Sequence, residues 1–297
     1  MHTILHNLYE FGFYKFNFAD ITTSSSIDDA FYQSHFDNSL SILSDIQTTI
    51  SNNVNTILGS GHSYLYNLHD HLHSTINTTH PSFISMLELQ THPLFIDIAK
   101  QYLLSNDANN VYIFNNFYAV NYNYGHSFNT RVQSQNWHRD PGSRKVLKCF
   151  IFFNDVDEYN GALEYIPKSH YSATNQILKK YDFNNCLSFY PFGTSSSSDI
   201  NIDNDFNYYR TIIECKAGDI VFVDTSGFHR AGSLLKNQYR LYSHTVFYSQ
   251  DMLNDMEKIN CNDKYYLGYN YYNLFDPNIN FKLLSSNKYK LFYKFSP

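Results

Sequence analysis

Cysteine is scarce in this chain, and its spacing excludes two kinds of site. The 297 residues include four cysteines, and no two of them form a C-x-x-C pair. Disulfide frameworks are typical of much smaller secreted domains, and thiolate zinc sites need closely spaced pairs. We therefore expect ordinary reduced cysteines in a cytoplasmic protein. They are Cys149, Cys186, Cys215 and Cys261.

Positive charge and long apolar runs are also lacking. The formal net charge is −6, whereas proteins that bind nucleic acids usually present a basic face. No apolar run approaches the roughly 18 residues of a membrane-spanning helix. The first 16 residues lack the basic and apolar segments of a secretory signal. We expect no nucleic-acid partner and no membrane association.

Aromatic residues are abundant. Tyr (27), Phe (25) and one Trp make up 18% of the chain, and the apolar fraction of 43% is enough for a sizeable core. Aromatic enrichment favours sheet. The first hundred residues nevertheless favour helices: apolar residues recur at three- and four-residue spacing over 30–50, and shorter helices are predicted over 82–90 and 93–104.

From about residue 107 the pattern changes to short strands with turn signals and no helices between them, which favours an antiparallel sandwich or barrel. We therefore divide the chain into a helical N-terminal region packed on the barrel (1–106), a β core (107–250) and a C-terminal extension (251–297). A polar, Ser- and Asn-rich insertion at 171–210 interrupts the core, and such segments are typical of functional lids or disordered insertions. Strands are predicted over 111–124, 145–156, 161–167, 211–225 and 239–249.

The stretch NWHRDPGS places His138 and Asp140 two residues apart. In an extended segment such residues point to the same side, although an isolated pair is also common in surface turns. His229 follows a turn after the apolar strand DIVFV, and a rolled sheet could bring it to the pair. Two imidazoles and one carboxylate on one face leave open positions for oxygen chemistry at Fe(II). The sequence therefore predicts a metal site at His138, Asp140 and His229.

Arg240 lies 11 residues beyond His229, on the next predicted strand. A buried guanidinium binds a carboxylate through two parallel hydrogen bonds. A dicarboxylate cosubstrate such as 2-oxoglutarate needs such a partner at its distal end, so Arg240 is the candidate cosubstrate-binding residue. Lys148, on the strand after H-x-D, is a second candidate partner for cosubstrate or substrate.

The order of these elements resembles the phytanoyl-CoA dioxygenase (PhyH-like) family of Fe(II)- and 2-oxoglutarate-dependent oxygenases. The resemblance covers roughly residues 110–250. Lys168 stands where the family commonly has glycine, and we interpret it as a turn variant. The matching elements are His138 and Asp140, Asp155-Val156, N-G-A-L at 160–163, I-P-K-S-H at 166–170, Gly218-Asp219, His229 and Arg240.

The resemblance implies a mainly β fold with flanking helices, a double-stranded β-helix of the jelly-roll, cupin-like type. It implies that His138, Asp140 and His229 are the catalytic and metal-ligating residues, with Fe(II) bound and 2-oxoglutarate as cosubstrate. The expected reaction is hydroxylation of a small-molecule C–H bond by O2, with release of succinate and CO2. Halogenating relatives replace the carboxylate ligand with a small residue, so Asp140 argues against halogenation.

The alternative is a jelly-roll module that binds a metal or ligand without catalysis. No motif identifies the substrate or the oligomeric state. Three nearby residues are expected to be structural: His170 in its turn, His244 in the core and Trp137 behind the ligand loop.

Overall fold

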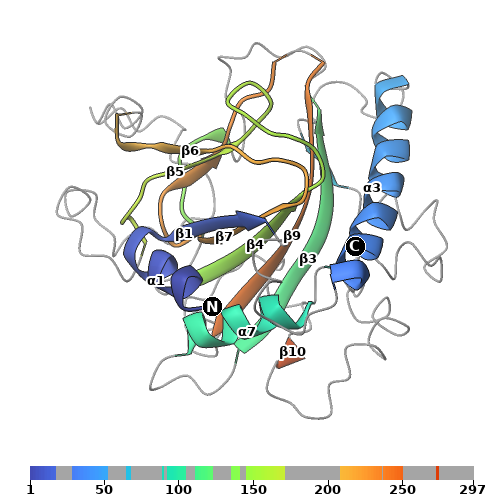
Figure 1. Ribbon diagram of the computed structural model, residues 1–297. Helices are drawn as coiled ribbons and strands as arrows, with labels where there is room; N and C mark the ends of the chain where they lie inside the picture. Colours follow the sequence, from blue (N-terminus) through green and yellow to red (C-terminus); the bar gives the residue numbers. More distant parts are fainter. Residues whose placement is uncertain are drawn as a thin grey trace, which may run out of the picture.

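The computed structural model describes residues 1–17, 29–52, 65–67, 89, 92–104, 111–122, 135–140, 145–170, 208–235, 237–249 and 272–273. The predicted insertion, apart from its last three residues, lies outside this part of the chain. So do the helix predicted over 82–90, except for Leu89, and the C-terminal extension, except for the short β10. The described residues form a mainly β structure with helices on one side (Figure 1).

A large antiparallel sheet forms one layer. Its strand order is β1-β7-β4-β9-β3-β10, and β2 pairs with the C-terminal part of β3. The strand predicted over 239–249 has the same limits in the structure, whereas the predicted 145–156 shortens to the seven residues of β4. The strands are β1 (Phe13–Asn17), β2 (Leu65–Asn67), β3 (Val111–Tyr122), β4 (Val146–Phe152), β7 (Asp219–Asp224), β9 (Tyr239–Ser249) and β10 (Tyr272–Asn273).

A smaller sheet forms the second layer, with the order β6-β5-β8. Its strands are β5 (Leu163–Tyr165), β6 (Thr211–Ile213) and β8 (His229–Ala231), all antiparallel. Side chains from this sheet, among them Tyr165 and Ile213, share one buried cluster with Val223 and Tyr242 of the large sheet. The two sheets therefore pack face to face, which confirms the predicted double-stranded β-helix.

Alternation along β4 divides its side chains between two environments. Leu147, Cys149 and Ile151 point outward and join the cluster that the helices cover. Phe150 and Phe152 point inward, into the cluster between the sheets. Because successive residues of a strand face opposite sides, Lys148 must point inward as well.

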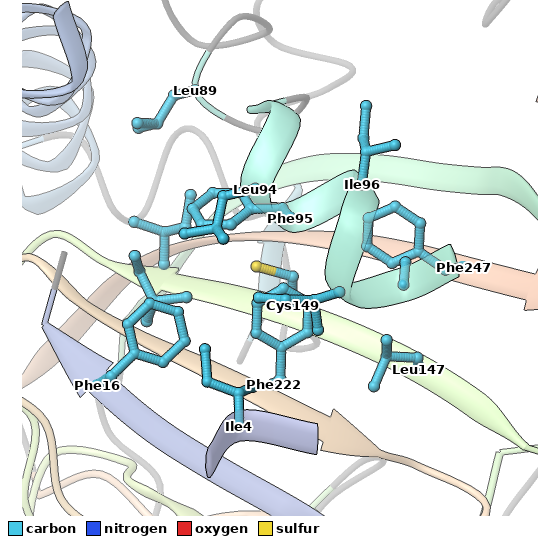
Figure 2. Packing of buried hydrophobic residues seen from close by; sticks show 14 of the residues in the cluster. Ile4, Phe16, Leu89, Leu94, Phe95, Ile96, Leu147, Cys149, Phe222 and Phe247 are labelled. Atoms are coloured by element: carbon cyan, nitrogen blue, oxygen red, sulfur yellow. The ribbon is translucent and has the colours of Figure 1, made fainter. Parts of the chain in front are cut away.

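Within the described ranges, three helices cover the outer face: α1 (His2–Phe11), α3 (Asp29–Asn52) and α7 (Pro93–Leu103). In α7, His92 caps the first turn by accepting a hydrogen bond from the Leu94 amide, and Pro93 occupies a first-turn position. Figure 2 shows Phe95 of this helix over the large sheet, and its ring centroid lies 5.8 Å from that of Phe222. Full burial of such side chains contributes about 1.5–3 kcal/mol each. None of the helices in the described ranges is long and apolar enough to cross a membrane.

The N-terminal region differs from the helical expectation because it also supplies strands, β1 and β2. β1 pairs with β7 along its full length and closes one edge of the large sheet. The chain reverses from α1 into β1 at Gly12, whose φ is 88°. A β-carbon at Gly12 would lie 2.3 Å from the Tyr165 hydroxyl, so the turn requires glycine for both reasons. With only five residues, β1 carried too short an alternation to be recognised in the sequence.

Candidate metal centre

The backbone joins the two predicted histidine ligands directly. His138 and His229 form an isolated antiparallel bridge, in which each amide donates to the other carbonyl at 2.9–3.0 Å. This bridge adds the segment around His138 to the free edge of β8. The two histidines are 91 positions apart in the sequence, but their ring centroids are 4.3 Å apart.

Asp140 completes the group. One ligand atom from each of the three side chains can be chosen so that all lie within 4.8 Å of one another. The His229 Nε2 atom is 4.0 Å from Oδ1 of Asp140, too far for a hydrogen bond. A single ion about 2.0–2.2 Å from each atom could bridge such a gap. The spacing therefore fits a shared cation better than direct contact.

The orientation of both rings also suits metal binding. Nδ1 of His138 lies 2.8 Å from the Asn136 carbonyl, and Nδ1 of His229 lies 2.9 Å from the Gly227 carbonyl. Each carbonyl favours a proton on Nδ1, which leaves a lone pair on Nε2. Metal-ligating histidines are commonly oriented through the second nitrogen in this way.

The electrostatics of the group keep its donor atoms available. Burial, and to a smaller extent the neighbouring His138 ring, lower the pKa of His229 to about 3. Burial also lowers the pKa of His138. For Asp140, burial acts to raise the pKa, but Lys148 and the two imidazoles outweigh it and the pKa falls below its usual range. At neutral pH the group therefore offers two neutral imidazoles and a carboxylate.

A short loop at 224–228 supports the ligands through its carbonyl groups. The Thr225 carbonyl accepts the Asp140 amide at 2.9 Å, and the Gly227 carbonyl faces His229 Nδ1. The Ser226 carbonyl accepts from Arg139 Nε, between the two ligands of the H-x-D pair. Three successive carbonyl groups of one loop thus contact both the H-x-D segment and His229.

Asp224 anchors this loop. Its Oδ1 atom accepts the amides of Val146 (3.2 Å) and Ser226 (3.0 Å), and its Oδ2 atom accepts the Tyr102 hydroxyl at 2.7 Å. Tyr102 belongs to α7, so the helical layer is linked to the loop that carries His229. Our sequence reasoning missed this role, although an acidic residue ending the apolar run DIVFV was a usable signal.

A buried ion pair lies beside the histidine bridge. Arg230 donates from Nε and Nη2 to Glu164 on the adjacent strand, at 3.1 and 2.8 Å. Its guanidinium lies 4.3 Å above the Trp137 ring. The buried Trp137 therefore packs against Arg230. This stack joins the two segments next to the histidine bridge.

Arg240, the predicted cosubstrate residue, lies on β9 and is buried. Its guanidinium stacks 4.6 Å from the Tyr242 ring and donates to the Gly161 carbonyl. His244 follows on the same face, with its ring edge-on to Phe150 at 5.3 Å. Burial lowers the pKa of His244 well below its ordinary value, which suits a neutral ring in the barrel interior. Arg240 therefore faces the interior but does not belong to the three-residue group.

Lys148 contacts the site directly. Its Nζ atom lies 2.6 Å from Oδ2 of Asp140, and only 15% of its side chain is exposed. The sequence predicts Lys148 as a partner for cosubstrate or substrate, whereas in the structure its ammonium pairs with the predicted ligand Asp140. The signal was present in the alternation of KVLKCFIFF, which places Lys148 on the inner face.

The I-P-K-S-H turn explains the departure at Lys168. This residue has a φ of 63°, in the left-handed region that glycine adopts most easily. Its amide donates to the Phe11 carbonyl and its ammonium pairs with Glu10, so contacts with α1 hold the strained residue in place. His170 also contacts this helix, through the Tyr9 carbonyl at 3.1 Å. Both residues attach α1 to the barrel.

With fold and site in place, comparison with known proteins gives the class. The profile of the phytanoyl-CoA dioxygenase (PhyH) family matches residues 66–241, more than half of the chain. The chain belongs to this family, and with it to the Fe(II)- and 2-oxoglutarate-dependent oxidoreductases. A search of curated proteins finds no match.

Solved structures show a more distant likeness. The non-heme alpha ketoglutarate dependent epimerase SnoN from nogalamycin biosynthesis is 12% identical, covering 83% of this chain and 82% of its own, with a TM-score of 0.48. AviO1 from Streptomyces viridochromogenes Tue57 is 13% identical over 84% of this chain and 96% of its own, also at 0.48. EctD from S. alaskensis with bound Fe is 14% identical over 85% and 78%, again at 0.48. The family assignment rests on the domain match.

Proposed function

We propose that this protein hydroxylates a C–H bond of a small molecule, with release of succinate and CO2. The observation that carries the proposal is the convergence of His138, Asp140 and His229 in a family that uses Fe(II) and 2-oxoglutarate. When bound, these two supply the oxidising chemistry with O2. The residues of the chain have to bind, orient and shield the reactants.

The donor set fits Fe(II). Two neutral imidazoles and one carboxylate form the ligand set of non-haem oxygenases, and no thiolate competes with them among the described residues. Nε2 of each histidine and Oδ1 of Asp140 would hold the metal. The barrel wall behind them is rigid, because the ligands sit on a backbone bridge and on the loop anchored by Asp224.

Arg240 is our candidate for the distal carboxylate of 2-oxoglutarate. Its buried guanidinium faces the barrel interior, and its Nη1 atom donates to the neutral Gly161 carbonyl. Guanidinium hydrogen bonds to carboxylates are stronger than those to neutral carbonyls. A hydrogen bond from Arg240 to the cosubstrate carboxylate would therefore be stronger than the one that it donates to the Gly161 carbonyl.

The inner wall offers an apolar environment to the reactants. Phe150, Phe152 and Tyr242 form an aromatic row with ring centroids 5.9–6.4 Å apart. Such a wall excludes water and strengthens electrostatic interactions within the site. We expect it to favour substrates with an apolar part near the reacting carbon.

The experiment is a succinate-release assay over a panel of small metabolites. Succinate should form only when Fe(II), O2 and 2-oxoglutarate are all present, and a substrate should stimulate its release. Omitting each component in turn provides the controls. A protein that binds Fe(II) and 2-oxoglutarate but releases no succinate with any substrate would favour the alternative of a non-catalytic binding module.

A further inference from the structure

The two oxygens of Asp140 face different partners. Oδ1 is the oxygen 4.0 Å from Nε2 of His229, whereas Oδ2 is the oxygen 2.6 Å from the Lys148 ammonium. One oxygen therefore faces the metal position, and the other is held by a cation that belongs to the chain.

Lys148 is well placed to keep this arrangement. It lies on the inner face of β4, where its backbone neighbours across the sheet are Val223 and Val246. These neighbours offer no competing anion, and at 15% exposure water reaches the ammonium only in part. An ion pair in such surroundings is stronger than one on the surface. The position of Lys148 and its partial burial therefore both favour the ion pair with Oδ2 of Asp140.

From this geometry we propose that Lys148 is a positioning residue that restricts Asp140 to one-oxygen ligation and weakens metal binding. This inference rests on the proposed function, since it concerns the same site. With Oδ2 engaged, Asp140 occupies one coordination position instead of two. The position that is spared stays open for the cosubstrate or O2, which the chemistry requires.

The effect on metal affinity has a definite sign. The ammonium carries the same sign of charge as the metal and lies next to one of its ligands, so it repels the ion. It also withholds one donor oxygen. Removing Lys148 would relieve the repulsion and free Oδ2, and both changes strengthen metal binding. An ordinary supporting residue behaves in the opposite way, because its loss usually weakens binding by 10–100-fold.

The test is a titration of the purified protein with Mn²⁺, followed by electron paramagnetic resonance of the free ion. We expect Lys148→Met to bind Mn²⁺ about tenfold or more tightly than wild type. Lys148→Arg, which keeps the charge and the donor, should stay within about threefold. Lys148→Gln keeps a donor for Oδ2 without charge and should fall between wild type and Lys148→Met. This variant decides the question if Lys148→Met does not fold.

Lys145→Met is the matched control. It removes the same charge three residues away, where the ammonium lies over the Tyr9 and Tyr102 rings instead of the metal group. Its Mn²⁺ affinity should equal that of wild type. Unchanged or weaker Mn²⁺ binding in both Lys148→Met and Lys148→Gln would overturn the inference and leave the proposed function standing. Failure of the wild type to bind Mn²⁺ would overturn both.

Discussion

The two faces of the large sheet put the same strands to different uses. On the outer face, Leu147, Phe222 and Phe247 of β4, β7 and β9 are fully buried apolar side chains under the helices (Figure 2). On the inner face, the same β4 and β9 carry Lys148 and Arg240, together with aromatic residues. The outer face is mainly apolar, with the Asp224 carboxylate at the end of β7 satisfied by hydrogen bonds, whereas the inner face combines apolar packing with two cationic side chains.

This difference separates stability from function. Buried charges cost free energy unless they are paired, so the inner face cannot be the main source of stability. The apolar side chains of the outer face carry no such cost and can support the strands that carry the site. Substitutions on the two faces should therefore have different consequences.

The largest effect is expected at a metal ligand. His229→Ala should remove metal binding and reduce turnover by about a thousandfold or more, because two ligands cannot hold the ion in place. The exposed His6→Ala is the control and should behave as wild type. Turnover and bound iron should be measured on the same samples. A His229→Ala protein with full iron content would show that His229 is not a ligand.

On the outer face, Phe222→Ala should lower the free energy of unfolding by about 3–5 kcal/mol, since Phe222 packs against Phe16 and Phe95 with ring centroids 6.2 and 5.8 Å away. The measurement is denaturant unfolding. Tyr208→Ala, at a residue 82% exposed, should change stability by no more than about 0.5 kcal/mol. Metal affinity of the folded Phe222→Ala protein should be preserved, and its loss would contradict the division between the faces.

Arg240→Ala tests the cosubstrate on the inner face. Loss of one member of a buried charge pair costs about 2–5 kcal/mol, so 2-oxoglutarate affinity should fall about thirtyfold or more. Arg240→Lys should recover only part of it, because an ammonium cannot form the two-point contact. The readout is a 2-oxoglutarate titration of the metal-to-ligand charge-transfer band at equal iron loading. Equal affinity in wild type and Arg240→Ala would remove Arg240 from the site.

The smallest effect concerns pH and the helical layer. Burial lowers the pKa of His92 to about 4, from 6.5 in the unfolded chain. Below pH 6.5 the unfolded chain binds a proton that the folded protein does not, so stability is lost as pH falls from 6.5 towards 4. Between pH 6.5 and 5 the loss from His92 is about 1.5 kcal/mol. His92→Asn keeps a cap for α7 without titrating and should flatten the curve; an identical slope would rule out His92 as its source.

Much of the barrel could be predicted from sequence because its main strands are long and each carries its own apolar pattern and turn signals. The runs that became β3, β4, β7 and β9 are rich in aromatic and branched residues and end at turn signals. The short β1 and β8 were missed. Three to five residues carry too little alternation, and their pairing depends on contacts with segments far away in the sequence.

The site shows the same division. His138, Asp140 and His229 could be proposed because the residue types and the H-x-D spacing limit the chemistry. Two other contacts join residues that are not neighbours in the sequence. Lys148 forms an ion pair with Asp140, 8 positions away, and Tyr102 donates a hydrogen bond to Asp224, 122 positions away. No sequence pattern specifies which acid a lysine or tyrosine will meet. Such contacts are fixed only when the sheets close.

The central claim is that His138, Asp140 and His229 bind one iron ion, and anomalous diffraction at the iron edge tests it most directly. Crystals grown anaerobically with Fe(II) and 2-oxoglutarate should give one strong anomalous peak per chain. The peak should lie about 2.0–2.2 Å from Nε2 of both histidines and from Oδ1 of Asp140. A peak at other residues, or a fully ordered His138–His229 bridge with no peak beside it, would contradict the account.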